Sequence, residues 1–483
     1  MMKKIIIYLL SLSALLALVS CGGSVKDVPD ETAGSLSASG SGDISVTETD
    51  APSTSAAADL PWRLSDDGTL TVYENVETEL QLPALAPWYS KKEKIKNAVI
   101  KSGVTDIGER AFEGCTHLKS ITVDEGNGSY LSEDGVLFDK EKNVLICFPA
   151  AKKIEYYAIP DGVISVAGSA FYSCRSVREV TIPDGVKSIG NSAFFGCDNL
   201  RAVSLPESVE TVGDWAFLNC SALAGITIPD SVQYVGTGLA DGTAFYGDGS
   251  NWDNGILYIG NHLISADRSA SGELAVRPGT LTVAGMAFSG CSFVTGITIP
   301  DSTALIGGNT FTGCDLLTYI DVDGQNNNYS SADGVLFDKE KTTLLCFPSG
   351  KEAGSYTVPD GVTFIADKAF SFCSLGSVIL PEGLKSVGDD SFYDCESLTG
   401  IIVPSGVTSI GARAFYSCVS LTSVTLPQSV GSIGEWAFSE CAPELVISCP
   451  SGSFPEQYAK DNGIGYSPYP ADRPTVLKDS RQL

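Results

Sequence analysis

Histidine is scarce in this chain, with only His117 and His262 among 483 residues. A Ser-His-Asp or Cys-His arrangement needs a histidine beside a nucleophile and an orienting carboxylate, and nothing marks either position in that way. The chain also lacks H-E-x-x-H, a Walker loop and a G-x-G-x-x-G after a strand. We therefore expect both histidines in solvent-exposed loops, no cofactor and no enzymatic activity. A hydrolase that depends on one of these histidines is the remaining catalytic alternative.

Positive charge is scarce as well. Lys and Arg number 31 against 58 Asp and Glu, which gives a net charge of −27. Such a surface repels phosphates, so nucleic acid is excluded as a partner. The acidity favours solubility in an exposed setting, or attraction of basic partners and divalent cations. Two Asp/Asn-rich segments, 248–253 and 321–328, offer oxygens to calcium, but neither follows the twelve-residue calcium loop with its terminal Glu, and we interpret them as solvated turns.

Long apolar runs are almost absent beyond the N-terminus. Lys3 and Lys4 precede an apolar stretch, 5–19, that is typical of a secretion signal and too short to span a bilayer. The run LVSCG at 18–22 resembles the bacterial lipobox, in which Cys21 becomes the lipidated first residue; an ordinary signal peptide with a chance cysteine is the alternative. We expect a lipoprotein signal peptide over 1–20 and a disordered Ser/Thr/Ala/Gly-rich linker over 21–60. The protein would be exported and would touch the membrane only through its lipid anchor.

What the chain has in abundance is a 23-residue repeat. VKSIGNSAFFGCDNLRAVSLP at 186–206 stands beside VETVGDWAFLNCSALAGITIP at 209–229, and VTSIGARAFYSCVSLTSVTLP follows at 407–427. The shared pattern is apolar-x-x-apolar-Gly-x-x-Ala-Phe-x-x-Cys-x-x-Leu-x-x-Val-x-apolar-Pro, and it recurs in about eleven units. Self-similarity at a fixed period indicates a solenoid, in which each unit buries its apolar face against its neighbours.

Each unit predicts one coil of that solenoid. A short strand with alternating polarity, such as 180–182, ends at a proline that cannot donate to a ladder. An Asp-Gly or Glu-Ser turn follows. The spacing of Ala-Phe-x-x-Cys-x-x-Leu favours a short helical or 3₁₀ turn. Successive strands would stack as a parallel sheet at about 4.8 Å per coil, so eleven coils would extend roughly 50 Å.

Fourteen cysteines in an exported protein first indicate disulfides. Ten of them, however, occupy one position of the repeat, where the side chain faces the coil interior. Stacked neighbours would lie about 5 Å apart with parallel Cα–Cβ vectors, which is poor geometry for an unstrained bridge. A single column also cannot supply the four tetrahedral ligands of zinc. We therefore expect a reduced, structural cysteine ladder and no metal.

The pattern Ile-Gly-x-x-Ala-Phe-x-x-Cys-x-x-Leu-x-x-Val-x-Ile-Pro resembles the BspA-type, or Treponema-type, leucine-rich repeat of bacterial surface proteins. The resemblance covers roughly 99–449, which we expect to be the solenoid domain. It implies a surface protein that binds extracellular proteins or glycoproteins: host matrix proteins, mucins or other microbes. Composition and spacing identify no such target by themselves.

Insertions and caps complete the expected architecture. Residues 133–149 and 332–348 are near copies at an offset of 199, and 254–264 has the same form, so each predicts a β-hairpin. These hairpins define insertions near 127–158, 240–278 and 325–357. Terminal coils need a cover for their apolar face. We expect an N-terminal β cap over 61–98 and a C-terminal cap with a short helix, followed by a tail, over 450–483.

Two strips of side chains are candidates for ligand binding. The outward strand positions are small, uncharged or apolar, and would accept a polypeptide or glycan at little desolvation cost: Thr122, Thr181, Ser204, Thr227, Thr298, Ile379, Ile402 and Thr425. A second strip follows the core phenylalanines as exposed aromatics, which can anchor a protein partner: Tyr172, Phe195, Tyr393 and Tyr416. Both strips have a purely structural alternative, as a flat face and as cover for the coil edges.

The leading functional hypothesis is therefore a cell-surface lipoprotein that acts as an adhesin or protein-recognition scaffold. The alternative is a glycan-binding surface lipoprotein that serves a nutrient-uptake system. Binding to matrix proteins and to a glycan array would separate the two.

Overall fold

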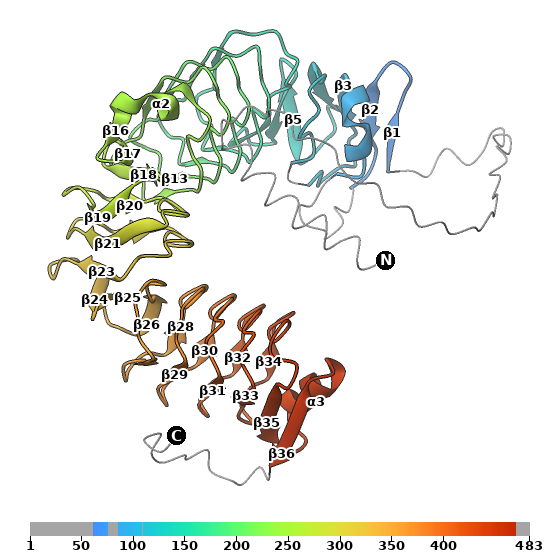
Figure 1. Cartoon of the computed structure of the whole chain (residues 1–483). Coiled ribbons are helices and arrows are strands. Elements are labelled where there is room, and N and C mark those ends of the chain that lie inside the picture. Colours follow the sequence, from blue (N-terminus) through green and yellow to red (C-terminus); the bar gives the residue numbers. More distant parts are fainter. Residues whose placement is uncertain (1–60, 76–85, 109, 470–483) are drawn as a thin grey trace, which may run out of the picture.

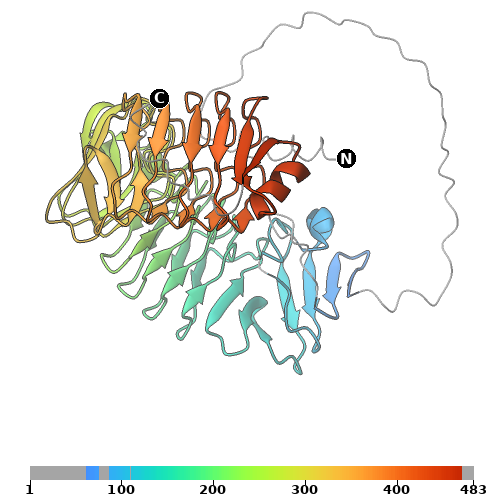
Figure 2. The same ribbon diagram turned by 90° about the horizontal axis from the view of Figure 1, so that it is seen from below.

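The computed structural model of the chain describes residues 61–75, 86–108 and 110–469. The expected signal peptide, the proposed lipidation site Cys21, the 21–60 linker and the 470–483 tail lie outside the described residues. The described chain winds into successive coils that follow an open arc (Figure 1). Seen from below, the coils stack one behind another along both halves of the arc (Figure 2). The predicted repeat solenoid is confirmed.

Two rows of mostly parallel strands run along the arc. Each regular coil gives one strand to each row, and strands of neighbouring coils pair in register, as Val203 with Ile226 and Ile189 with Val212. We call them the long-strand row and the short-strand row. The sequence reasoning found only the first, because two-residue strands such as Ser188–Ile189 are too short to show alternation.

The long-strand row consists of four sheets that follow one another along the arc. Their strands, in chain order, are β1 (Trp62–Leu64), β2 (Thr69–Val72), β3 (Asn97–Ile100) and β4 (Ser120–Val123); β8 (Tyr156–Ala158), β10 (Glu179–Thr181), β12 (Ala202–Ser204) and β14 (Gly225–Thr227); β19 (Ser271–Ala275), β21 (Phe293–Ile299) and β23 (Tyr319–Val322); β27 (Ser355–Thr357), β29 (Ser377–Ile379), β31 (Gly400–Ile402), β33 (Ser423–Thr425), β35 (Val446–Pro450) and β36 (Gly465–Tyr469).

The short-strand row consists of three sheets, each of which begins with an antiparallel hairpin. Its strands are β5 (Tyr130–Glu133), β6 (Val136–Asp139), β7 (Val144–Cys147), β9 (Ser165–Val166), β11 (Ser188–Ile189), β13 (Thr211–Val212) and β15 (Tyr234–Val235); β16 (Trp252–Asp253), β17 (Ile256–Ile259), β18 (His262–Ala266), β20 (Thr282–Val283) and β22 (Leu305–Ile306); β24 (Tyr329–Ala332), β25 (Val335–Asp338), β26 (Thr343–Cys346), β28 (Phe364–Ile365), β30 (Ser386–Val387), β32 (Ser409–Ile410) and β34 (Ser432–Ile433). The three predicted hairpins are therefore present and built into the row.

The turn segment Ala-Phe-x-x-Cys is hydrogen-bonded from coil to coil. Phe171 N–H donates to the Ala193 carbonyl at 2.7 Å, and Ser173 N–H donates to the Phe195 carbonyl at 2.7 Å. Two residues per coil, such as Ser169 and Ser173, have φ near +57° and +56°. Residues in this left-handed region interrupt a right-handed helix, so the predicted turns occur as separate β-turns rather than as a 3₁₀ helix.

The glycine after each short strand is required by close packing. A Cβ on Gly190 would lie 2.4 Å from the backbone nitrogen of Gly168 in the preceding coil. Since no side chain fits at that distance, the Ile-Gly of the repeat is a backbone constraint.

The core is a ladder of stacked phenylalanine rings inside the coils. Phe171 and Phe194 have ring centroids 4.8 Å apart, and Phe392 and Phe415 have them 5.0 Å apart. The ladder is interrupted after Phe112 and after Phe311, where a hairpin takes the place of the next coil, and also after Phe217, where Ala240 stands at the phenylalanine position. The buried residues form three clusters, within 70–147, 136–336 and 335–459. The β6 and β25 hairpin strands lie at the two boundaries.

Both ends of the described solenoid carry a cover. At the N-terminal end β1 and β2 form a hairpin, and the buried Trp88 donates its Nε1–H to the Ala111 carbonyl at 2.7 Å. At the other end the helix α3 (Phe454–Asp461) places Tyr458 edge-on to Phe438, with centroids 6.1 Å apart. The remaining helical pieces are η1 (Tyr89–Lys94), α2 (Ala244–Gly247) and η2 (Gly249–Asn251). The structure thus confirms a solenoid capped at both ends.

A buried asparagine holds the start of each of the two duplicated hairpins. Asn326 Nδ2 donates to the carbonyls of Pro300 and Thr303 at 2.8 and 2.9 Å. Its Oδ1 accepts the backbone N–H groups of Asn328 and Tyr329, both at 2.8 Å. Asn127 repeats this arrangement at the first hairpin. All four hydrogen-bonding positions of the amide are therefore used in a site without solvent access.

We expect Asn326→Ala to destabilise the protein by about 2–4 kcal/mol, because it removes these bonds and leaves buried carbonyls and N–H groups unsatisfied. Urea unfolding followed by circular dichroism measures the effect. The exposed neighbour Asn327 is the matched control, and Asn327→Ala should change the stability by less than about 0.5 kcal/mol. Equal effects of the two substitutions would contradict this role of Asn326.

Candidate binding surface

The predicted outward strip lies on the long-strand row. Seven of its eight side chains are exposed, and the eighth, Thr425, is half-buried. The register brings neighbouring members together: Ser204 pairs with Thr227 and Ile402 pairs with Thr425. Thr227 Oγ1 donates to Ser204 Oγ at 2.9 Å, so these hydroxyls form a cross-coil pair. At these two pairs the strip is a flat strand face made of uncharged side chains.

The strip is not continuous, because the long-strand row is divided into four sheets. The register also adds members that sequence reasoning missed: Ala158 beside Thr181, Ala275 and Asp321 beside Thr298, Thr357 beside Ile379, and Ser448 beside Thr425. Four of the five added positions lie 23 residues from their partner in the strip, and Thr357 lies 22 residues before Ile379, so the repeat period itself could have located them. The face therefore consists of separate patches.

The second predicted strip, described as exposed aromatics, needs correction. The four side chains are half-buried rather than exposed, and they stack in pairs: Tyr172 with Phe195 and Tyr393 with Tyr416. The rings of Tyr172 and Phe195 are 4.8 Å apart at an angle of 5°, and those of Tyr393 and Tyr416 are 5.4 Å apart at 7°. Their flat faces cover one another, and burial raises the pKa of Tyr172 to about 12. These residues chiefly extend the packing at the coil edges.

Other aromatic side chains are more accessible. Tyr156, on β8 directly beside Glu179 of β10, is 66% exposed. Trp215 and Trp436 are 40% and 49% exposed, and both occupy the left-handed position before the repeat alanine. Sequence reasoning missed them because the outward direction of that position follows from its positive φ. Tyr156 borders the patch of the long-strand row formed by Thr181, Ser204 and Thr227.

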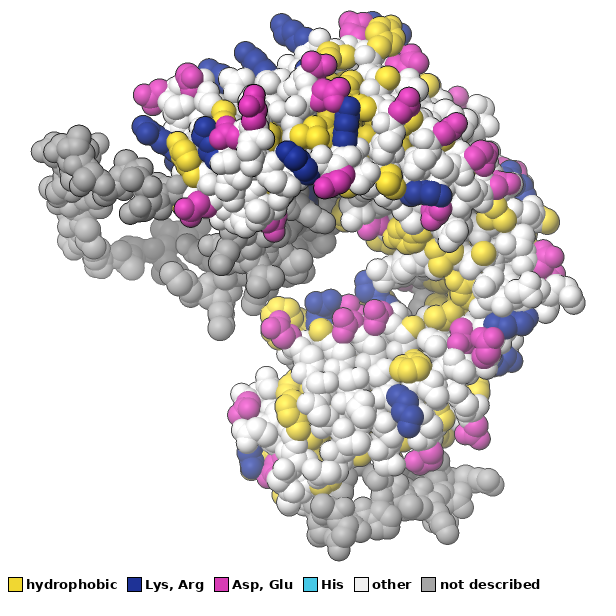
Figure 3. Space-filling model, turned by 180° about the vertical axis from the view of Figure 1, so that it is seen from behind, with side chains coloured by type: hydrophobic (Ala, Val, Ile, Leu, Met, Phe, Trp, Pro, Cys, Tyr) yellow, Lys and Arg dark blue, Asp and Glu magenta, His cyan; other side chains and the backbone are white. Residues whose placement is uncertain are grey.

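Charge is unevenly spread over the surface. Viewed from behind, acidic and basic side chains are scattered over the N-terminal half, whereas the C-terminal half is mostly uncharged (Figure 3). Several charged residues pair between coils, as Lys187 Nζ with Glu210 Oε1 at 2.7 Å and Arg413 Nε with Asp390 Oδ1 at 2.7 Å.

The histidines behave differently from each other. His117 is exposed, as expected, and its Nδ1 lies 3.4 Å from Glu93 Oε2. His262 is buried in β18, so the expectation of an exposed loop is wrong for this residue. Its Nδ1 lies 2.9 Å from Thr282 Oγ1 and its Nε2 lies 3.0 Å from the Pro229 carbonyl. Burial lowers the pKa of His262, and both ring nitrogens are used to join neighbouring strands and turns.

The two acidic loops use their oxygens internally. Asp323 Oδ1 accepts the N–H of Gln325, and Asp248 Oδ1 accepts the N–H and hydroxyl of Ser250. The side-chain amide of Asn326 already makes the four hydrogen bonds described above for the hairpin. Over the described residues no group of three or more His, Cys, Asp or Glu is placed to hold a metal ion.

The repeat cysteines form a column of thiols that bond to backbone. Cys197 Sγ lies 3.0 Å from the Phe171 carbonyl, and Cys418 Sγ lies 3.1 Å from the Phe392 carbonyl. Both thiols thus donate to the phenylalanine carbonyl of the coil before, whereas Cys291 donates to the carbonyls of Ala266 and Asp267. All thirteen cysteines from Cys115 to Cys449 are free. Burial raises the pKa of the Cys115 and Cys441 thiols to about 12, which keeps them protonated at neutral pH.

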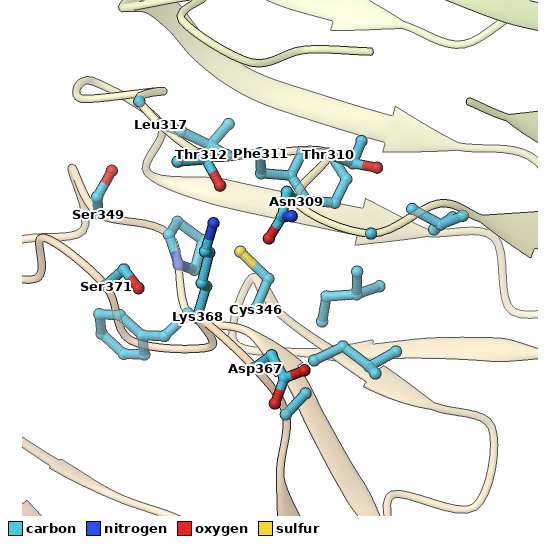
Figure 4. A pocket seen from close by; sticks show the side chains of 18 of the residues that line it. Asn309, Thr310, Phe311, Thr312, Leu317, Cys346, Ser349, Asp367, Lys368 and Ser371 are labelled. Carbon is cyan, nitrogen blue, oxygen red and sulfur yellow. The ribbon is translucent and has the colours of Figure 1, made fainter. Parts of the chain in front are cut away.

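Two clefts open where the duplicated hairpins interrupt the coil stack. The first cleft, of about 430 Å³, lies between 106–113 and 165–169 and is lined by Arg110, Glu113 and Ser169. The second cleft, of about 340 Å³, lies between 306–313 and 366–372. In the second, Lys368 extends across the cavity toward Thr312, with Asn309 and Cys346 beside it (Figure 4). Volumes near 300–1,000 Å³ are typical of small-molecule sites.

Together, the stacked parallel strands, the internal phenylalanine ladder and the outward small-residue face define a repeat solenoid of the leucine-rich class. The chain belongs to a bacterial family within it: the BspA type leucine rich repeat region matches in six copies, over residues 87–133, 146–246, 274–349 and 341–454. These matches cover more than half of the chain, and the resemblance inferred from the repeat pattern is confirmed.

Solved leucine-rich repeat structures are similar to this chain at low identity. One is a leucine-rich repeat protein from Eubacterium ventriosum, with 20% identity, 80% of this chain and 75% of that chain covered, and a TM-score of 0.36. A leucine rich cell surface protein from Faecalibacterium prausnitzii has 23% identity, coverages of 86% and 98%, and a TM-score of 0.33. The pneumococcal vaccine antigen PcpA has 17% identity, coverages of 84% and 98%, and a TM-score of 0.32.

A search of curated proteins found no significant match. Among the described residues, no helix has the length and apolar character needed to cross a membrane.

The thiol column predicts a specific labelling pattern. Native protein at pH 8 should react slowly with a thiol reagent at its buried cysteines, because the reagent cannot reach them, and faster at the half-buried Cys346 and Cys441. In guanidinium without reductant, all thirteen cysteines from Cys115 to Cys449 should react. Mass spectrometry of the alkylated peptides counts them. Pairs of these cysteines that react only after reduction would show disulfides and contradict the reduced ladder.

Proposed function

We propose that this protein is a cell-surface recognition scaffold, an adhesin, that binds extracellular protein through the outward face of the long-strand row. The observation that carries the proposal is the patch formed by Thr181, Ser204 and Thr227 with Tyr156 at its border. Small uncharged side chains cost little to desolvate, and a 66%-exposed tyrosine supplies the aromatic anchor that protein interfaces favour.

A second patch on the same row supports this choice of face. Ile379 and Ile402 are 42% and 43% exposed, and they lie among the exposed Thr357 and the half-buried Thr425. Covering branched apolar side chains that are exposed to water on a flat strand face lowers the free energy and therefore favours binding of a partner.

The proposed location is the outer side of a bacterial membrane, with attachment through a lipid on Cys21. This rests on the N-terminal sequence pattern alone. Cys21→Ala should abolish incorporation of radiolabelled palmitate and release the protein from the membrane fraction, while Cys197→Ser, at a repeat position, should leave both unchanged. Palmitate labelling of Cys21→Ala at the level of the unaltered protein would exclude the anchor.

Binding to immobilised fibronectin, laminin, fibrinogen and mucin, measured by surface plasmon resonance, tests the recognition face. We expect saturable binding to at least one of them, and a loss of about tenfold or more in affinity for Thr227→Glu and for Ile402→Glu, because each buries a charge at the interface. Thr211→Glu is the matched control, since Thr211 is an exposed strand threonine on the short-strand row.

An equal loss for Thr211→Glu would show that the binding face is wrongly assigned. Saturable binding on a glycan array without binding to any of the four proteins would instead favour the alternative, a glycan-binding lipoprotein of a nutrient-uptake system.

A further inference from the structure

The two clefts are copies of one another. The segments 104–174 and 303–373 align without a gap at the offset of 199, so Arg110, Glu113 and Ser169 correspond to Asn309, Thr312 and Lys368. The chemistry of the two copies has diverged at these positions. Comparison of the clefts therefore shows which chemical groups fit into the shared backbone framework and which of these groups are missing from the second cleft.

In the first cleft a carboxylate of the chain itself joins the two walls. Glu113, 8% exposed, accepts Arg110 Nη2 at 2.7 Å and the Ser169 hydroxyl at 3.0 Å. Arg110 belongs to one wall and Ser169 to the other. The site built at this interruption of the coil stack thus holds a carboxylate with charged and neutral donors around it.

The second cleft has donors but no such carboxylate. Lys368 brings a half-buried ammonium group to the wall where Ser169 stands in the first copy. Over residues 61–75, 86–108 and 110–469, the side chains of Asn309, Thr312 and Lys368 form no hydrogen bond or ion pair. Thr312 occupies the position of Glu113, and its shorter side chain leaves the space open.

Backbone donors add to this set. In the preceding coil, Met286, Phe288 and Gly290 donate their N–H groups to carbonyls of 308–312 at 2.9–3.0 Å. The corresponding N–H groups of Asn309, Phe311 and Gly313 have no acceptor within the described part of the chain, because the hairpin replaces the next coil. Asn309 and Gly313 share the left-handed φ of Met286 and Gly290, so their N–H groups face the cleft. Unpaired amide groups in a row are an anion-binding arrangement.

The rest of the cleft fits a sugar. Ser349 and Ser371 donate their hydroxyls to the carbonyls of Cys314 and Asp390, each at 2.8 Å, and keep lone pairs for ligand hydroxyls. Phe372, 40% exposed, gives an apolar surface for C–H groups. The nearest acidic lining residue, Asp367, points away from the Lys368 ammonium and accepts the Asp389 N–H at 2.8 Å (Figure 4).

We infer that the second cleft binds the carboxylate of an acidic sugar residue, a uronic or sialic acid, in the place that Glu113 fills in the first cleft. Lys368, Asn309 and the free N–H groups receive the carboxylate, and Ser349 and Ser371 accept the sugar hydroxyls. This site is independent of the strand face proposed above for protein binding.

Isothermal titration calorimetry of the full chain with glucuronate, N-acetylneuraminate, glucose and acetate tests the inference. We expect one site for an acidic sugar and at least about tenfold weaker binding of glucose, the matched sugar without a carboxylate, since charge-assisted hydrogen bonds are lost. Glucose that binds as tightly as both acids would overturn the site. Acetate that binds as tightly as the acidic sugars would overturn the assignment to a sugar.

Two variants place the ligand in the cleft. Thr312→Glu supplies the carboxylate of the first copy within the second cleft and should weaken acidic-sugar binding by about tenfold or more. Lys368→Gln should have a similar effect without filling the cleft, and it tests the inference even if Thr312→Glu does not fold. Lys385→Gln, at an exposed lysine outside the cleft, is the control and should bind normally. Unchanged binding by Lys368→Gln would refute the proposed site.

Discussion

The structure depends on hydrogen bonds that run from one coil to the next through the turns as well as through the strands. Phe171 N–H reaches the Ala193 carbonyl, and the flanking left-handed residues Ser169 and Ser173 donate in the same direction. Within an uninterrupted run of coils this arrangement holds one phenylalanine ring above the next, and it brings thiols such as Cys197 to the phenylalanine carbonyl of the coil before. A coil has little to stabilise it alone, so the stack is the unit of folding.

Much of this fold could be predicted from the sequence, because strict repetition repeats the same physical requirement. The long strands follow from alternation at positions such as 180–182, and the hairpins follow from near-identical segments at an offset of 199. The short strands could not be predicted, since two residues show no period. The left-handed backbone at Trp215 and Met286 could not be predicted either, because residues with such side chains seldom adopt positive φ. They adopt it here because the stacking of the coils imposes it.

The candidate binding surface could be predicted only in part. Alternation correctly places Thr181, Ser204 and Thr227 outside, but the pairing of Tyr172 with Phe195 depends on ring stacking between coils. His262 was expected in a loop, and it lies buried in a strand, where it joins a hydroxyl to a carbonyl. The clefts depend on which backbone groups lose their partners at a hairpin, and this is determined by three-dimensional neighbours rather than by residue type.

The division of the interior at β6 and β25 has a mechanical consequence. Buried residues form separate clusters on either side of each boundary, and the phenylalanine ladder does not cross it. A tensile load applied to the two ends of the solenoid would therefore be borne by segments in series, each with its own buried core. Unfolding of one segment would lengthen the chain and lower the force on the others. The molecule would therefore unfold in steps under load and dissipate mechanical energy at each step.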